Sequence, residues 1–135
     1  MENQQDTAST IRMIADYMEN GYLENIIDMF KHDPEYYQHV GTMLGDERMG
    51  VRIGTIALVE TLVDVENNDL PSSISGIASL LNDSNVTIRG DAAHVLGIIG
   101  HTDALPYLEK ALHDKHEMVR ENVREAIEEI KYGKV

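Results

Sequence analysis

The chain has 135 residues, of which 24 are acidic and 11 are basic, so its net charge at pH 7 is −13. This charge repels phosphate backbones and anionic lipids, which argues against nucleic acid and membrane binding. It suits a partner with a basic surface, and it is equally explained by a charge that only keeps the protein soluble. The lack of cysteine excludes disulfides, thiolate metal sites and cysteine nucleophiles. The length and the polar opening segment predict one soluble, cytoplasmic domain over residues 1–135.

The N-terminal part of the chain is the least regular, and helices are expected near residues 7–19 and 22–31. We expect this segment, about 1–33, to form an irregular cap on the rest. Beyond it, apolar residues recur at helical spacing. They predict helices near 34–44, 47–66, 70–81, 85–100, 104–112 and 116–132. Taken in pairs, these helices define repeats at about 34–69, 70–103 and 104–135, and the fold class is all-α.

Prolines and glycines mark the expected helix ends. Pro34, Pro71 and Pro106 each fall near the start of the first helix of a pair. Each proline has an aspartate one to three residues before it, and these aspartates are expected to cap the helices: Asp33, Asp69 and Asp103. Gly100 and Gly133 lie where second helices should stop.

One motif recurs between the paired helices: an aspartate, four residues, valine or isoleucine, then arginine. It gives Asp46 with Arg52, Asp83 with Arg89, and Asp114 with Arg120. A degenerate fourth copy places Asp6 before Arg12 at the same spacing. A residue type needed once per repeat indicates a structural role rather than a catalytic one.

The run "NVTIRGDAAHVLGIIGHTDALPYLEKALHDKHEMVREN" resembles the HEAT-like repeat of phycobilin lyase subunits. The matching positions are Ile88, Arg89, Ala92, Ala93, Leu96, Gly97, Ile99, Gly100, Asp103, Ala104, Leu105, Pro106 and Leu108. The resemblance is close over residues 70–131, fair over 34–66 and poor before that. It implies a right-handed α-α superhelix, a HEAT-like solenoid, of about four helix pairs.

The resemblance also implies that the repeated aspartates and arginines lie in the turns and bond along the stack. These six residues, the structural ladder, are Asp46, Arg52, Asp83, Arg89, Asp114 and Arg120. An aspartate at a helix start can accept hydrogen bonds from free backbone amides, and an arginine fork can reach oxygens across a repeat junction.

Histidines are the natural place to look for a metal or a general base. Asp91, His94 and His101 could share one face of a helix, and His113, His116 and Glu117 surround a turn. Such groups could hold a metal, but a solvated polar face is the simpler interpretation, and we assign no metal.

Enzyme motifs are missing from the sequence: it has no G-x-S-x-G, phosphate-binding loop, dinucleotide fingerprint or H-E-x-x-H. The pair His116–Glu117 resembles the His-Glu pairs of deoxyhypusine hydroxylase, a HEAT-like di-iron enzyme. This sequence has one such pair where that enzyme needs several. We therefore assign no catalytic residue and no cofactor.

In resembling solenoids the second helices line the concave surface where partners dock. The positions one, five and nine after each arginine lie on one side of the second helix. Apart from Gly90, they give the expected partner-binding row: Ile53, Ala57, Thr61, His94, Ile98, Glu121, Glu125 and Glu129. The row changes from apolar to acidic along the stack. Its apolar part indicates a binding patch, a homodimer contact or a surface covered by the N-terminal helices.

The sequence therefore predicts a non-catalytic protein-interaction or scaffold module. Two enzyme-related alternatives stay open: a subunit resembling a bilin lyase, binding a tetrapyrrole at the face of His94 and Glu125, and a metal-binding enzyme.

Overall fold

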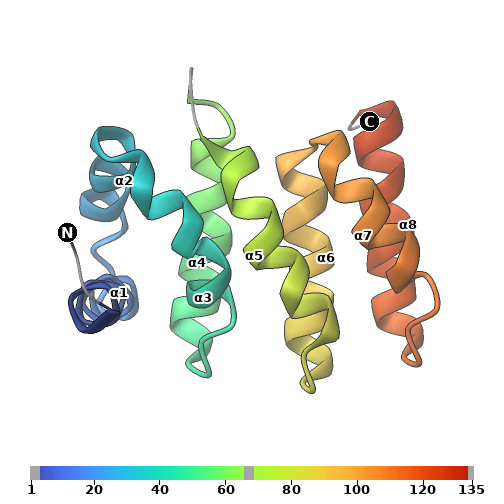
Figure 1. Cartoon of the computed structure of the whole chain (residues 1–135), viewed down its shortest axis with the longest axis horizontal. Helices are drawn as coiled ribbons and strands as arrows, with labels where there is room; N and C mark the ends of the chain where they lie inside the picture. The colour runs from blue at the N-terminus through green and yellow to red at the C-terminus, as the bar shows by residue number, and fades with distance from the viewer. Residues whose placement is uncertain (1–3, 66–68, 134–135) are drawn as a thin grey trace.

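The computed structural model describes residues 4–65 and 69–133, with side chains from residue 7 onward. In these residues the chain is all-α, as the sequence predicts (Figure 1). The α-helices are α1 (Gln4–Glu19), α2 (Leu23–His32), α3 (Val40–Leu44), α4 (Met49–Leu62), α5 (Ile74–Ser79), α6 (Val86–Ile99), α7 (Leu105–Ala111) and α8 (Glu117–Tyr132). The 3-10 helices are η1 (Pro34–His39), η2 (Leu70–Ser73), η3 (Leu80–Asn82) and η4 (Thr102–Ala104).

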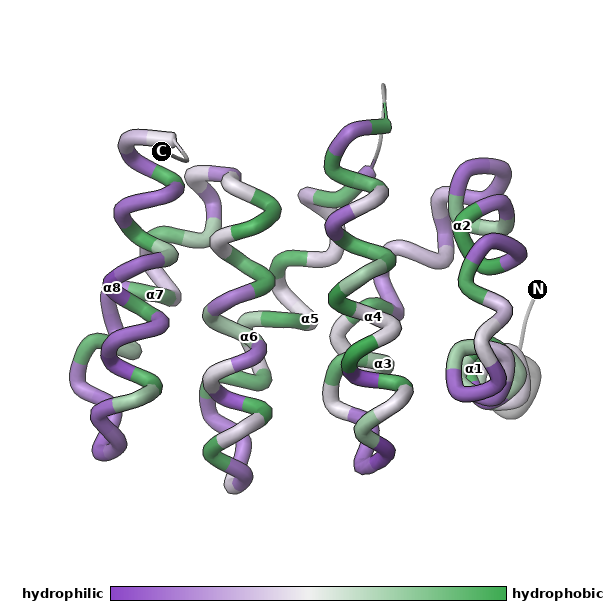
Figure 2. Tube along the Cα trace, turned by 180° about the vertical axis from the view of Figure 1, so that it is seen from behind, coloured by the Kyte–Doolittle hydropathy of each residue, from purple (hydrophilic) through white to green (hydrophobic). Residues whose placement is uncertain are grey.

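The helices form a stack of pairs two layers thick. Figure 1 shows α3, α5 and α7 in one layer, and the longer α4, α6 and α8 side by side in the other. Helix α1 lies beside α4, at the end of the stack where the chain begins. The exposed side of α4, α6 and α8, which faces the viewer in Figure 2, is called here the second-helix face.

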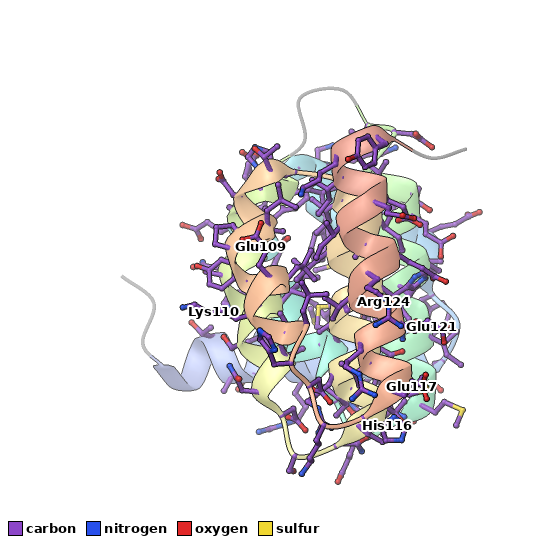
Figure 3. The ribbon with its side chains drawn as sticks, turned by 90° about the vertical axis from the view of Figure 1, so that its right-hand side faces the viewer. Glu109, Lys110, His116, Glu117, Glu121 and Arg124 are labelled. Carbon is purple, nitrogen blue, oxygen red and sulfur yellow. The ribbon has the colours of Figure 1, made fainter. Side chains whose placement is uncertain are left out.

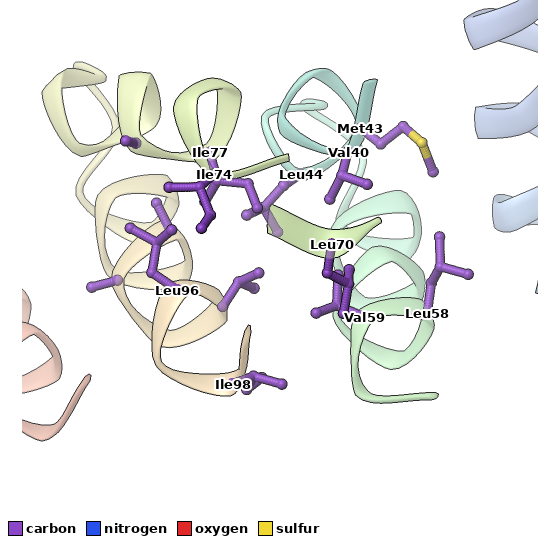
Figure 4. Close-up of a cluster of buried hydrophobic side chains, with 14 of the residues drawn as sticks. Val40, Met43, Leu44, Leu58, Val59, Leu70, Ile74, Ile77, Leu96 and Ile98 are labelled. Carbon is purple, nitrogen blue, oxygen red and sulfur yellow. The ribbon is translucent and has the colours of Figure 1, made fainter. Parts of the chain in front are cut away.

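The core lies between the two layers and is continuous from one pair to the next (Figure 4). Val40 and Leu44 of α3 and Leu58 and Val59 of α4 all belong to this core, and all four are fully buried. Full burial of an aliphatic side chain contributes about 1.5–3 kcal/mol. Because this core crosses each repeat junction, every pair depends on its neighbours for burial.

Glycines allow two pairs of helices to approach closely. A Cβ on Gly41 of α3 would lie 2.5 Å from the carbonyl carbon of Gly76 in α5. A Cβ on Gly97 of α6 would lie 3.0 Å from the Cα of Ala126 in α8. Gly41 requires glycine because the neighbouring backbone occupies the space of a side chain, and at Gly97 a side chain would push against α8.

The first helix of each repeat differs from the simple α-helix that the sequence predicts. Each begins as a 3-10 turn that contains the proline or lies just before it, and only the following residues are α-helical. Proline carries no backbone N–H and suits the first turn, where such groups have no partner inside the helix. Helix α4 is also shorter than predicted, from Met49 to Leu62 rather than 47–66, and residue 66 lies outside the described residues.

The expectation that the three proline-associated aspartates are caps holds for one of them. The carboxylate of Asp33 accepts from the N–H of Glu35 at 3.0 Å. Asp69 makes no side-chain cap, and the cap of η4 is the His101 ring, whose Nδ1 accepts from the N–H of Asp103. The expected C-terminal glycine of α6 is present: Gly100 has φ of 72° and donates to Leu96 O.

Candidate functional site

The three repeated arginines bind the turn that precedes their own helix. In each case Nη1 donates to the backbone carbonyl of the aspartate six residues earlier, at 2.7 to 2.9 Å. The pairs are Arg52 with Asp46, Arg89 with Asp83 and Arg120 with Asp114. A charged donor to a carbonyl is one of the stronger hydrogen bonds in proteins, so each arginine fixes the shape of its turn.

The repeated aspartates act in the turn and do not cap a helix, which corrects the sequence prediction. Asp83 Oδ1 accepts at 2.8 Å from the N–H of Asn85, the residue just before α6. Asp46 and Asp114 accept in the same way from the residue two positions on. The amides of α6 are capped by Asn85 and those of α8 by His116 Nδ1.

The expected contact along the stack is present between Arg89 and Asp114. Arg89 Nε donates to Asp114 Oδ2 at 2.8 Å, and Nη2 donates to Oδ1 at 3.3 Å. These side chains are only 7% and 8% exposed. Burial opposes ionisation of Asp114, but the hydrogen bonds from Arg89 and the N–H of His116 outweigh it, so the pKa of Asp114 lies below its usual value.

Arg52 does not form the same contact. Its nearest carboxylate in the next repeat is Asp91, in α6, at 4.0 Å from Nε. Burial raises the pKa of Asp91, against the opposing effects of Arg52 and His94. The junction between α4 and α6 is therefore held by a weaker polar contact than the junction between α6 and α8.

The degenerate N-terminal copy of the motif does not form a turn. Helix α1 runs through both Asp6 and Arg12, and the Asp6 side chain lies outside the described residues. The polar link to the N-terminal helices comes instead from Arg48, which bonds Asp16 at 2.9 Å and Glu19 at 3.3 Å. Sequence reasoning missed Arg48, because the position two residues after the motif aspartate holds a different residue in each repeat.

The histidine groups do not converge on a common centre. In the described part of the chain, no three histidine, aspartate or glutamate side chains are placed to hold a metal ion. Asp91 faces Arg52, while His101 and His116 cap helices through Nδ1. Histidine is an unusual cap, and residue preference alone would not have revealed this role.

The predicted partner-binding row lies on the second-helix face with one exception. Ile53 is 59% exposed, Thr61, His94, Glu121 and Glu125 are exposed, and Ala57 and Glu129 are half-buried. Ile98 is only 7% exposed and belongs to the core (Figure 4), so the expectation that it is a surface residue is wrong. It lies near the C-terminal end of α6, beside residues from the end of α4.

Ile53 and Met49 form the exposed apolar part of α4. They are four residues apart on one side of the helix, and Met49 is 66% exposed. Helix α1 covers the neighbouring side of α4, where Met18 fills the space beside Gly54, and leaves Ile53 uncovered. Figure 2 shows the change along this face, from apolar segments on α4 to mainly hydrophilic residues on α8.

A groove with a volume of about 680 Å³ lies on the second-helix face, where the C-terminal ends of α4, α6 and α8 lie next to one another. Its lining residues come from the ends of α4, α6 and α8: Glu60, Val63, Asp64, His94, Gly97, Ile98, Gly100, Glu129, Ile130 and Gly133. Sequence reasoning missed Glu60, in the last turn of α4, and Asp64, two residues beyond the end of that helix.

The C-terminal end of the stack is covered by charge. Figure 3 shows Glu109 and Lys110 on α7 and Glu117, Glu121 and Arg124 on α8, with all five side chains at this end of the molecule. All five are exposed. A polar outer surface of this kind is expected of a terminal repeat, which has no neighbour to bury it.

Stacked two-helix units with one shared core define this protein as an α-solenoid. A family model described as HEAT repeats matches residues 43–128, more than half of the chain. The chain therefore belongs to the HEAT repeat family. A search of the curated proteins gave no match. In the described residues, no helix is long and apolar enough to cross a membrane.

Proposed function

We propose that this protein is a non-catalytic interaction module that binds a partner protein across the second-helix face. HEAT repeats commonly serve as protein-interaction scaffolds, because stacking second helices gives one extended surface. The observation that carries the proposal is the exposure of Ile53 and Met49, which neither α1 nor the next repeat covers. Large apolar side chains exposed together on a soluble protein are typical of an interaction site.

The charge of the chain favours a partner with a basic surface. On α8 the row consists of Glu121, Glu125 and Glu129, and none of the three forms an ion pair in the described residues. An acidic surface speeds association with a basic partner and disfavours acidic ones. We place this interaction in the cytoplasm.

The test is Ile53→Glu, compared with Tyr107→Glu on α7, which carries an equally large change on the opposite layer. Ile53→Glu should keep the helical circular dichroism signal and lose the protein partner recovered from the native host, measured by quantitative mass spectrometry. Tyr107→Glu should keep both. An unchanged partner and unchanged mass in light scattering for Ile53→Glu would contradict the proposal.

A homodimer through Ile53 is the second candidate, and the same exposed patch supports it. It predicts a dimer mass in light scattering that falls to the monomer mass in Ile53→Glu. The lyase-like alternative, for which the sequence resemblance to phycobilin lyase subunits is the support, predicts a bilin absorption shift that depends on His94 and Glu125. A metal-binding enzyme predicts stoichiometric metal by elemental analysis.

A further inference from the structure

We infer that the groove at the ends of α4, α6 and α8 receives an arginine or lysine side chain from a basic segment of the partner protein. This inference rests on the proposed function and names the chemistry that one part of the second-helix face would recognise. Three features of the groove support it: its floor, its carboxylates and its place at three helix ends.

The floor of the groove is apolar. Ile98 is 7% exposed at its base, and Val63 and Ile130 are half-buried beside it. Arginine and lysine carry an aliphatic stem below the charged group, and that stem packs on apolar surface while the charge stays near water. The floor therefore suits the stem of a basic side chain better than it suits a small or acidic one.

The rim of the groove is acidic. It carries Glu60 of α4, Asp64 in the turn that follows α4, and Glu129 of α8, and its lining contains no lysine or arginine. In the described residues, none of these three carboxylates has an ion-pair partner within the protein. His94 is the other titratable group that faces the groove. The three carboxylates are therefore available to a cation from outside.

The groove also lies at the negative ends of three helices. Helix α4 ends at Leu62, α6 at Ile99 and α8 at Tyr132, and Figure 2 shows these ends side by side. The last carbonyls of a helix carry a partial negative charge that favours a nearby cation by about 0.3–1 kcal/mol. The helix ends and the carboxylates thus select the same sign of charge.

The Glu129 side chain occupies space that Gly97 leaves free. The carboxylate oxygen Oε2 of Glu129 lies 2.8 Å from the point where a Cβ on residue 97 would stand. The missing side chain at Gly97 thus leaves room for this carboxylate to lie over α6, at the wall of the groove. A side chain at position 97 would displace this carboxylate, so the glycine keeps one of the three acidic groups at the wall of the groove.

The test uses the whole protein and two labelled peptides. One is Gly-Ser-Leu-Arg-Arg-Leu-Ser-Gly, and the other has citrulline, which is neutral and has nearly the same shape, in place of each arginine. The arginine peptide should shift the amide signals of Gly97, Gly100 and Gly133 in a nitrogen–proton correlation spectrum. The citrulline peptide should bind at least about tenfold more weakly. Equal binding of both peptides, or no shift at these glycines, would overturn the inference.

A matched pair of triple variants separates the groove from the general acidity of the chain. Glu60→Gln with Asp64→Asn and Glu129→Gln should lose at least about tenfold in affinity for the arginine peptide. Glu24→Gln with Asp28→Asn and Glu128→Gln makes the same change in net charge at exposed positions outside the groove and should keep the affinity. If both triples weaken binding equally, the groove makes no specific contribution.

The partner identified with the Ile53→Glu experiment distinguishes the two proposals. If that partner still binds the groove variant with unchanged affinity, the inference about the groove is wrong and the proposed function stands. If neither Ile53→Glu nor the groove variant changes what the protein binds, the proposed function is wrong as well.

Discussion

Arg52 and Arg89 occupy the same place in successive repeats, but only Arg89 forms a close ion pair with the next repeat. Arg89 Nε is 2.8 Å from Asp114, whereas Arg52 Nε is 4.0 Å from Asp91. The spacing of the motif differs too: Asp83 follows Asp46 by 37 residues, and Asp114 follows Asp83 by 31. The α4–α6 junction thus uses a different aspartate, one that lies within α6.

The residues at the helix surfaces account for the difference between the two junctions. Helix α6 has Gly90 and Gly97 at the positions where α8 packs, and a Cβ at either would meet a neighbouring atom within 3.0 Å. The same positions in α4, one and eight residues after the arginine, hold Ile53 and Glu60. Both side chains are exposed on the second-helix face. Helices α6 and α8 therefore pack more closely than α4 and α6, and Ile53 stays exposed on α4.

The largest expected loss of stability comes from replacing Arg89, and the same replacement of Arg52 is the comparison. Arg89→Met leaves the buried Asp114 carboxylate without its partner and should lower the free energy of unfolding by about 3 kcal/mol. Arg52→Met loses bonds to two carbonyls and a weak ion pair, and should cost about 1 kcal/mol. Urea unfolding measures both. Equal losses would show that the two junctions are not held differently.

A second prediction concerns the close approach of α6 and α8. Gly97→Val forces a side chain against Ala126 and should cost about 2 kcal/mol by overpacking. Gly50→Ala is the control, because its Cβ would lie 3.8 Å from Glu19 and the helix gains from losing a glycine. Thermal unfolding should show a lower midpoint for Gly97→Val alone. A Gly97→Val protein as stable as the original would mean that the helices can separate without loss.

Removing a helix cap or a turn hydrogen bond near Asp83 should lower stability by a smaller amount. Asn85→Ala removes the acceptor for the amides of Thr87 and Ile88 and should cost about 1 kcal/mol. Asp83→Ala removes one partly exposed bond and should cost about 0.5 kcal/mol. Amide exchange in the first turn of α6 would rise in Asn85→Ala. If Asp83→Ala destabilised the protein more than Asn85→Ala, then Asp83 and not Asn85 would be the residue that caps α6.

The smallest expected effect on stability is at Asp91. The contribution of this residue to the free energy of unfolding depends on pH, because its pKa is raised. Its raised pKa means that the folded protein takes up a proton before the unfolded chain does, so ionised Asp91 destabilises the fold above that pKa. Asp91→Asn should therefore be slightly more stable than the original at neutral pH, by no more than about 0.5 kcal/mol, since the partly exposed ion pair with Arg52 that it loses contributes little.

For Asp114 the effect of ionisation on stability is the opposite of that for Asp91, because the ionised form stabilises the fold. Its pKa is lowered, so its contribution is present above the ordinary aspartate pKa and is lost as the pH falls through the lowered value. Urea unfolding of the original protein and of Asp91→Asn, followed from neutral to acid pH, tests this. The gap between the two curves should change while Asp91 titrates, and stability should then fall as Asp114 takes up its proton. A constant gap would contradict the assignment at Asp91.

The sequence by itself determined the helices, their pairing and the family. Apolar spacing placed every α-helix that the structure describes, because a helix must bury one side whatever its neighbours are. The repeated aspartate and arginine marked the turns, because every turn needs the same hydrogen bonds. The 3-10 starts of the first helices escaped this reasoning, since proline is compatible with either kind of turn.

Only the tertiary structure decided which contacts cross between repeats and which residues stay exposed. Ile53 and Ile98 occupy the same row, but the packing of neighbouring helices exposes one at 59% and buries the other at 7%. Likewise Arg89 reaches Asp114 while Arg52 does not reach Asp83, because a distance between repeats depends on how closely whole helices approach. A local pattern fixes what each residue needs, but the stacking of helices fixes which partner is within reach.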